Sequence, residues 1–259
     1  MGAMKKTALA TLSIFLALAA GQGQAQQAGP EFLQEREYQI CIHLARTEPE
    51  TAFEQSLSWA DAGGGPAALH CGAIALINLG HYKEAATRLE KLSKSLPDET
   101  PPGIAAEILA HAGLSWLEAD DLSRAFAALT SALELSPANP DILTDRATVL
   151  FLSGKYWESI DDLNKAIDVA PDQTEALTLR ASAYRHVDTL ELALDDATRA
   201  LELDPNQPEA LLERGIIYRL MGENDNARKD WLHLVDIHEG RPAADHAQRN
   251  LELLDVNKE

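Results

Sequence analysis

A segment that recurs every 34 residues decides the fold of this chain. Residues 122–140 read LSRAFAALTSALELSPANP, residues 157–173 read WESIDDLNKAIDVAPDQ, and residues 190–208 read LELALDDATRALELDPNQP. Each stretch closes near a proline, and successive prolines are 34 residues apart: Pro137, Pro171 and Pro205. A fixed period of this length is typical of repeat proteins, in which each unit is one small structural element packed against the next.

The same period divides residues 66–241 into five units. They are residues 66–99, 106–139, 140–173, 174–207 and 208–241, with a six-residue insertion at 100–105. The eighth, twentieth and twenty-seventh positions of these units are small in 13 of 15 places: Ala73, Ala85, Gly113, Ala125, Ala132, Ala147, Ser159, Ala166, Ala181, Ala193, Ala200, Gly215 and Ala227. Leu92 and Leu234 are the exceptions. Two helices approach to about 8–10 Å only where small side chains meet, so these positions predict helix crossings.

Glycine and proline mark the ends of the predicted helices. Gly80, Gly154 and Gly222 follow the first apolar stretch of their units, where glycine adopts the left-handed conformation that ends a helix. The proline near the end of a unit stops the second helix. Each unit is therefore predicted to be a pair of antiparallel helices.

This pattern resembles the tetratricopeptide repeat family over residues 66–241. The resemblance implies an all-α, right-handed superhelix, or α-solenoid, of antiparallel helix pairs with five to six units and a concave groove lined by the first helices. We expect residues 26–65 to form a degenerate N-terminal helical pair, and residues 242–259 a C-terminal capping helix and tail. Terminal units are expected to be atypical because they cover the apolar ends of the array.

The resemblance also implies which side chains face the groove and bind a protein or peptide partner. The predicted partner-binding residues are Ile74, Asn78, Leu114, Leu117, Thr144, Thr148, Phe151, Leu152, Thr178, Ser182, Arg185, Ile216 and Arg219, and the same positions of the repeat include His70, Ile77, Glu118, His186, Leu212 and Leu220. This surface is apolar in the middle and edged with hydroxyls, and we expect its two arginines to pair with an acid of the partner. The alternative is that part of the apolar set packs against neighbouring helices.

Three units carry an arginine at the seventh position and an aspartate sixteen residues later. The pairs are Arg146 with Asp162, Arg180 with Asp196, and Arg214 with Asp230. Because one residue lies on the first helix and the other on the second, the pattern predicts a ladder of ion pairs; the alternative is an anion site. Exposed pairs contribute about 0–1 kcal/mol each, so their expected role is to fix the register.

The first 25 residues predict a signal peptide for export. Lys5 and Lys6 precede a largely apolar stretch of 14 residues, 7–20, and Gly23-Gln24-Ala25 is a small-x-small cleavage site. The apolar stretch is shorter than the roughly 20 residues that span a bilayer, so a cleaved signal is favoured over an anchor. We expect the periplasm, or else the extracellular medium, and no membrane insertion after cleavage. In an oxidising compartment Cys41 and Cys71 are expected to form a disulfide; the alternative is two buried free thiols.

Charge and motifs exclude other classes of function. The chain has 41 acidic and 22 basic side chains and a net charge of −19, which disfavours nucleic acid as a partner. It has neither a Gly-x-Ser-x-Gly motif nor a phosphate-binding glycine loop, so we expect no enzymatic activity. His233, Asp236 and His238 cluster on one helix, but no histidine pair has the i,i+4 spacing, so neither a metal nor a cofactor is predicted.

These observations together predict an exported adaptor or scaffold for protein–protein interaction. We expect a helical or extended peptide segment in the concave groove. Some family members bind a peptide carboxylate through Lys and Asn side chains, but here those positions hold Thr144, Thr148, Thr178 and Ser182. Two alternatives are a periplasmic chaperone or assembly factor with loose specificity and a carrier of a small apolar ligand.

Overall fold

The computed structural model describes residues 30–256, and its regular elements in that span are helices. The predicted signal peptide, residues 1–25, lies outside the described residues. Twelve helices form successive pairs and a last one follows them: α1 (Pro30–Thr47) with α2 (Pro49–Trp59), α3 (Gly65–Asn78) with α4 (Tyr82–Lys94), α5 (Pro102–Glu118) with α6 (Leu122–Leu135), α7 (Pro140–Leu152) with α8 (Tyr156–Val169), α9 (Thr174–His186) with α10 (Leu190–Leu203), α11 (Pro208–Leu220) with α12 (Asn224–Ile237), and α13 (Pro242–Val256). A short π-helical segment, η1 (Ala60–Gly64), continues α2.

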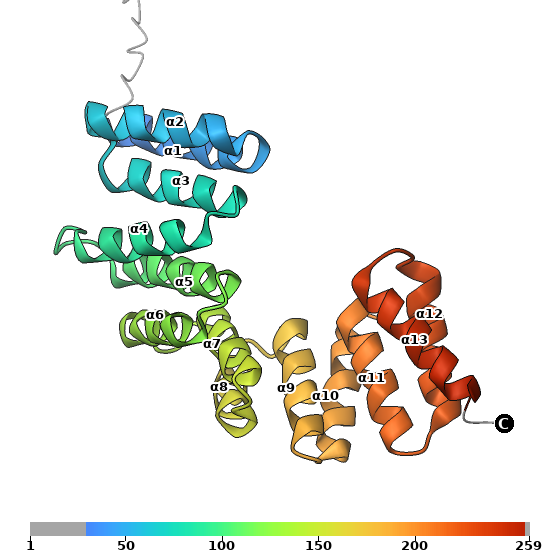
Figure 1. The fold of residues 1–259 in the computed structure, drawn as a ribbon. Helices are drawn as coiled ribbons and strands as arrows, with labels where there is room; N and C mark the ends of the chain where they lie inside the picture. The colour runs from blue at the N-terminus through green and yellow to red at the C-terminus, as the bar shows by residue number, and fades with distance from the viewer. Residues whose placement is uncertain (1–29, 257–259) are drawn as a thin grey trace, which may run out of the picture.

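The helices lie side by side in chain order and form a curved row (Figure 1). Each helix packs mainly against its neighbours in the sequence, as a repeat protein requires. The predicted all-α solenoid is confirmed. None of the helices between residues 30 and 256 is both long and apolar enough to cross a membrane.

The small residues of the repeat lie where helices meet. All 13 predicted small positions are buried, and so are the two leucines that break the pattern. A Cβ atom added to Gly113 would lie 2.6 Å from Leu129 Cγ, and one added to Gly215 would lie 2.2 Å from Trp231 Nε1. These glycines therefore allow a close approach that even alanine would obstruct.

The turn inside each unit uses a left-handed residue at the same position. Gly80, Gly154 and Gly222 have φ angles of 75°, 74° and 83°, as the sequence predicts. In the other two units Asp120 and Asp188 take this place, with φ angles of 59° and 61°. Aspartate tolerates this conformation better than most residues, which explains why the turn survives without glycine.

The insertion at residues 100–105 lengthens a helix. α5 begins at Pro102 and has 17 residues, whereas α7 has 13. Proline is accepted in the first turn of a helix because its missing N–H would be unpaired there in any case. Most of the insertion is thus the first turn of α5.

The predicted ladder of ion pairs is present and more deeply buried than expected. Arg180 Nε and Nη2 each lie 2.7 Å from an oxygen of Asp196, and the other two pairs have the same two-bond geometry at 2.7–2.9 Å. The side chains of the three aspartates are only 4, 9 and 10% exposed. The expectation of exposed pairs is wrong, because the small residues bring the two helices close enough to cover the carboxylates.

The ladder also joins neighbouring units. Arg146 Nη1 donates to Thr130 Oγ1 at 3.3 Å, and Arg180 Nη1 donates to Asn164 Oδ1 at 2.7 Å. Each acceptor lies sixteen residues before its arginine, on the second helix of the preceding unit. One arginine therefore connects three helices.

A disulfide connects the first helix to the repeats. Cys41 of α1 and Cys71 of α3 are bonded, with Cα atoms 6.1 Å apart. Both are buried in a small apolar cluster with Ala45, Ala52 and Ala75. This covalent link ties the degenerate N-terminal pair to the first regular unit.

Candidate partner-binding groove

The first helices of three successive units form a pocket of about 380 Å³. α1, α3 and α5 contribute its lining: Tyr38, Ile42, Arg46, His70, Ile74, Ile77, His111, Leu114, Ser115 and Glu118. The walls are mainly aliphatic, and Arg46 and Glu118 supply one charge of each sign. We call this surface the groove pocket. It occupies the N-terminal end of the predicted groove.

A chain of polar rings crosses the groove pocket from α1 to α5. Tyr38 Oη lies 2.8 Å from His70 Nδ1, and His70 Nε2 lies 3.1 Å from His111 Nδ1. The rings are stacked, with centroids 5.9 Å and 5.2 Å apart. The chain of hydrogen bonds fixes the three side chains relative to one another.

Burial keeps the two imidazoles of this chain uncharged. Burial, together with the nearby His111, lowers the pKa of His70 to about 4. Burial likewise lowers the pKa of His111, although the charge of Glu107 acts in the opposite direction. A neutral histidine has one donor and one acceptor. Those of His70 are both used within the chain, whereas His111 keeps Nε2 for a further hydrogen bond.

The structure brings part of the predicted site together here. Ile74 and Leu114 line the groove pocket, together with His70, Ile77 and Glu118. Asn78 is exposed one turn beyond Ile74, and its amide donates to the Ile74 carbonyl at 3.0 Å. Leu117 packs against the main apolar core instead, as does Ile216 at the other end of the row.

The predicted hydroxyl edge is already satisfied within the helices. The hydroxyls of Thr144, Thr148 and Thr178 donate to main-chain carbonyls four residues earlier, at 2.8, 2.9 and 2.8 Å. Thr178 is also buried, at 6% exposure, which removes it from the groove surface. Ser182 is partly exposed on the same helix. The threonines therefore do not offer the free donors that the sequence suggested.

The C-terminal part of the predicted site contains an aromatic cluster. The ring centroids of Phe151 and His186 are 5.2 Å apart, and His186 stacks on Tyr156 at 4.5 Å. Burial and then the charge of Arg185 lower the pKa of His186. Leu152 is exposed beside this cluster.

The two predicted arginines differ in what they contact. We expected Arg185 to pair with an acidic group of the partner. In the structure it already pairs with the carboxylate of Glu213 in its own chain. A guanidinium already bound at a buried carboxylate has little capacity left. Arg219 Nε, by contrast, is buried without a hydrogen-bond partner among the described residues. Of the two, Arg219 is the one with unused donors.

Sequence reasoning missed the contribution of α1 and of His111. Tyr38, Ile42 and Arg46 belong to the degenerate first pair, to which the 34-residue numbering does not extend. His111 lies one position after the one that faces the groove in the repeat pattern. Its place becomes visible only through its hydrogen bond to His70.

The histidines near the C-terminus bind the main chain and side chain of one asparagine. His233 Nε2 lies 3.1 Å from Asn206 Oδ1, and His238 Nε2 lies 2.7 Å from the Asn206 carbonyl. Within residues 30–256 no group of three or more His, Cys, Asp or Glu side chains is arranged to hold a metal ion.

Sequence models of the tetratricopeptide repeat match three parts of the chain. The matched ranges are residues 72–140, 117–183 and 197–229. Together they span more than half of the sequence and fall on α3 to α12. A comparison with curated proteins found no match.

Solved structures with the same arrangement of helices include MamA and YrrB. MamA from Desulfovibrio magneticus RS-1, residues 41 to the end, superposes with a TM-score of 0.57 at 19% identity, covering 66% of this chain and 93% of its own. YrrB, a tetratricopeptide repeat protein with an unusual peptide-binding site, gives 0.56 at 20% identity, covering 76% and 98%. At these identities the likeness establishes the fold alone.

Proposed function

The chain belongs to the tetratricopeptide repeat family, and on this premise we propose that it is a non-catalytic adaptor that binds a peptide segment of a partner protein. The segment lies in the concave groove, with its anchor residue in the groove pocket. The observation that carries this proposal is that pocket itself. It is built by the first helices of three successive units and combines aliphatic walls with a chain of neutral hydrogen-bonding rings.

The lining of the groove pocket favours a partner segment of mixed character. Ile42, Ile74 and Leu114 offer apolar surface to an aliphatic or aromatic anchor. The Nε2 atom of His111, which lies outside the chain of hydrogen bonds, offers a hydrogen bond to a polar group next to that anchor. YrrB, which shares the fold, has a peptide-binding site, and this supports the assignment of the groove to peptide binding.

The proposed location is the periplasm. The lysine pair and short apolar stretch of residues 1–25 favour export, and a disulfide between Cys41 and Cys71 suits an oxidising compartment. The acidic surface disfavours nucleic acid, so the partner is a protein. Fractionation of cells that express the full chain, with the mature N-terminus determined by mass spectrometry, tests this part.

The groove is tested by capturing partners with variants of its wall. A photo-crosslinking amino acid at Leu114 should capture a protein from the cell envelope, and Ile74→Asp should abolish that capture because a carboxylate replaces the apolar anchor surface. Ile74 is partly exposed, so helical content by circular dichroism should be unchanged.

The matched control makes the same kind of change on α12, the second helix of its unit, which does not line the groove pocket. Leu232→Asp of α12 also adds a carboxylate at an exposed apolar residue, and it should leave capture intact. Equal capture by the Ile74 and Leu232 variants would reject the groove. Weak binding of many unrelated apolar peptides would support a chaperone of loose specificity instead of an adaptor.

A further inference from the structure

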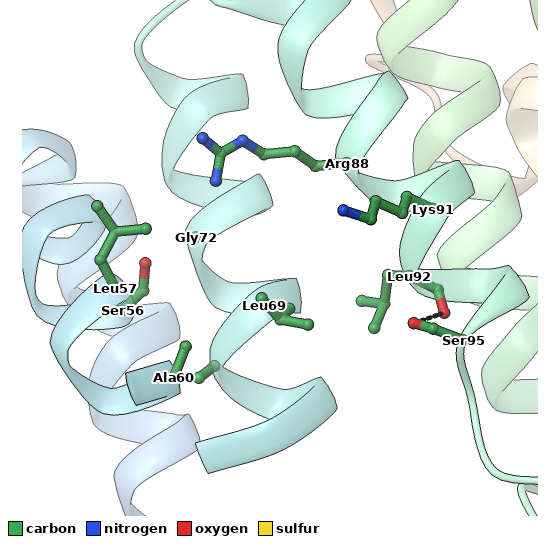
Figure 2. Close-up of a pocket in the computed structure, with 10 residues that line it drawn as sticks. Ser56, Leu57, Ala60, Leu69, Gly72, Arg88, Lys91, Leu92 and Ser95 are labelled. Atoms are coloured by element: carbon green, nitrogen blue, oxygen red, sulfur yellow. Dashed lines mark hydrogen bonds between the residues drawn. The ribbon is translucent and has the colours of Figure 1, made fainter. Parts of the chain in front are cut away.

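A second pocket lies outside the groove, between α2, α3 and α4. Its volume is about 390 Å³, and it shares no lining residue with the groove pocket. Figure 2 shows Arg88 and Lys91 of α4 pointing toward α3, while Leu57 of α2 and Leu69 of α3 lie on the other side. We call it the α4 pocket.

The α4 pocket occupies the place of a missing ladder arginine. In the units 140–173 and 174–207 that arginine binds a residue sixteen positions before it and an aspartate sixteen positions after it. In the unit 66–99 the same three positions are Ser56, Gly72 and Arg88, and all three line the α4 pocket. A Cβ atom added to Gly72 would lie 2.5 Å from Ser56 Oγ, so a longer side chain is not accommodated there. An arginine stands where the last three units have an aspartate.

As a consequence, the side chains of Arg88 and Lys91 both line the α4 pocket, and no carboxylate lies between them. In the unit 140–173 the residue equivalent to Lys91 is Lys165, whose Nζ donates to Asp162 Oδ1 at 3.1 Å. That aspartate is replaced by Arg88 here, and Lys91 has no side-chain partner within the described residues. Arg88 forms an exposed ion pair with Glu84, one turn earlier on its own helix, and its guanidinium lies over the Phe53 ring, 5.1 Å from the centroid. None of the residues that line the α4 pocket is acidic.

The apolar wall of the α4 pocket is uncovered for the same reason. Leu69 is at the fourth position of its unit and is 46% exposed. The leucines at this position in the last three units are at most 2% exposed: Leu143, Leu177 and Leu211. Leu69 is thus an exposed apolar side chain beside two cationic side chains, Lys91 and Arg88, and the ion-pair partner of Arg88 is the exposed Glu84.

We propose that the α4 pocket binds a small amphipathic carboxylate, a molecule with an acidic head and a short hydrocarbon chain. The carboxylate takes the place of the missing aspartate and accepts charge-assisted hydrogen bonds from Arg88 and Lys91. The hydrocarbon chain covers Leu57 and Leu69. The volume is within the range of about 300–1,000 Å³ for small-molecule sites.

Calorimetric titration of the purified protein with octanoate tests the head group. Octanoate should bind saturably, while 1-octanol should bind at least tenfold more weakly and octylammonium not at all. Acetate, which has the head group without the chain, should also bind at least tenfold more weakly. Equal affinity for octanoate and 1-octanol, or no binding of octanoate, would overturn the proposal.

A pair of double variants tests the location. Arg88→Gln with Lys91→Gln should weaken octanoate binding at least tenfold. Lys83→Gln with Lys94→Gln removes the same charge from α4 at residues that do not line the pocket, and it should leave the affinity unchanged. Equal weakening by both would mean a non-specific charge effect and would refute the site.

A third variant and the groove variant separate the remaining explanations. Leu69→Asp should abolish binding without emptying the core, because Leu69 is largely exposed. Ile74→Asp should retain octanoate binding, so the α4 pocket and the groove can fail independently. An acidic peptide that binds through Arg88 and Lys91 in a protein that ignores octanoate would assign the site to a macromolecule and would also overturn the proposal.

Discussion

Removing one aspartate of the ladder should expose how strongly the ion pairs hold the repeats together. Asp196→Ala leaves Arg180 without the two hydrogen bonds of 2.7 Å that join α9 to α10. The arginine side chain is only 16% exposed, so water cannot fully replace the carboxylate. Burial by itself would lower the pKa of Arg180, and the hydrogen bond and charge of Asp196 outweigh it and raise that pKa.

The expected loss follows from these contacts. Breaking a buried pair by removing one partner costs about 3–5 kcal/mol. Arg180 keeps its hydrogen bond to Asn164, which places the loss at the low end, about 3 kcal/mol. Replacing both partners, Arg180→Met with Asp196→Leu, should cost less than the single change because no charge is left buried.

Urea unfolding followed by circular dichroism measures the loss, and hydrogen exchange in α9 and α10 shows whether it is local. The control is Glu84→Ala, which removes an exposed ion pair with Arg88 and should cost less than about 1 kcal/mol. A cost for Asp196→Ala no larger than that control, or a double variant as unstable as the single one, would refute the reasoning.

Three further changes probe other parts of the fold. Reducing the Cys41–Cys71 disulfide opens a loop of 30 residues and should cost about 4 kcal/mol on the chain-entropy model; thiols that alkylate without a reductant would show that the bond is absent. Burial raises the pKa of Asp145 from 3.8 to about 6, so the folded state keeps a proton that the unfolded state releases. The contribution of Asp145 to stability should therefore fall as pH rises from about 4 to 6, and Asp145→Asn should remove that contribution and stabilise the protein at pH 7.5 by up to about 3 kcal/mol; a stability difference between the two proteins that does not grow with pH would contradict it. Gly215→Ala should destabilise by about 1–3 kcal/mol because its Cβ would meet Trp231, and an unchanged urea midpoint would show that the helices can separate.

The fold could be predicted because its determinants are periodic and steric. A small residue such as Gly113 is required wherever two helices cross, and the same requirement recurs in every unit, so spacing alone identifies it. The ladder was predictable for the same reason. The left-handed turns at Asp120 and Asp188 were not predicted, because aspartate is common on a solvated surface for other reasons and does not by itself indicate a turn.

The candidate site was predicted less well because it depends on contacts between units. Arg185 has a partner 28 residues away in Glu213, and no spacing rule of the repeat identifies that pair. The hydroxyl of Thr178 donates to its own helix, which sequence cannot distinguish from a donor that faces the groove. The absence of an arginine at Gly72 is visible in the sequence, but the pocket that Gly72 lines is visible only once α2 and α4 are placed beside it.

The ladder spans only the last three units, and this uneven bracing has a mechanical consequence. From α7 to α12 a buried arginine–aspartate pair joins the two helices of each unit. The units from α1 to α4 lack a ladder pair, and the covalent bond there joins α1 to α3 and not to α2. We expect the C-terminal half to behave as a stiff arm and the N-terminal half as a compliant one that can change its curvature. Binding of a partner segment in the groove pocket would then be accompanied by a change in the curvature of α1 to α4, while α7 to α12 keep their arrangement.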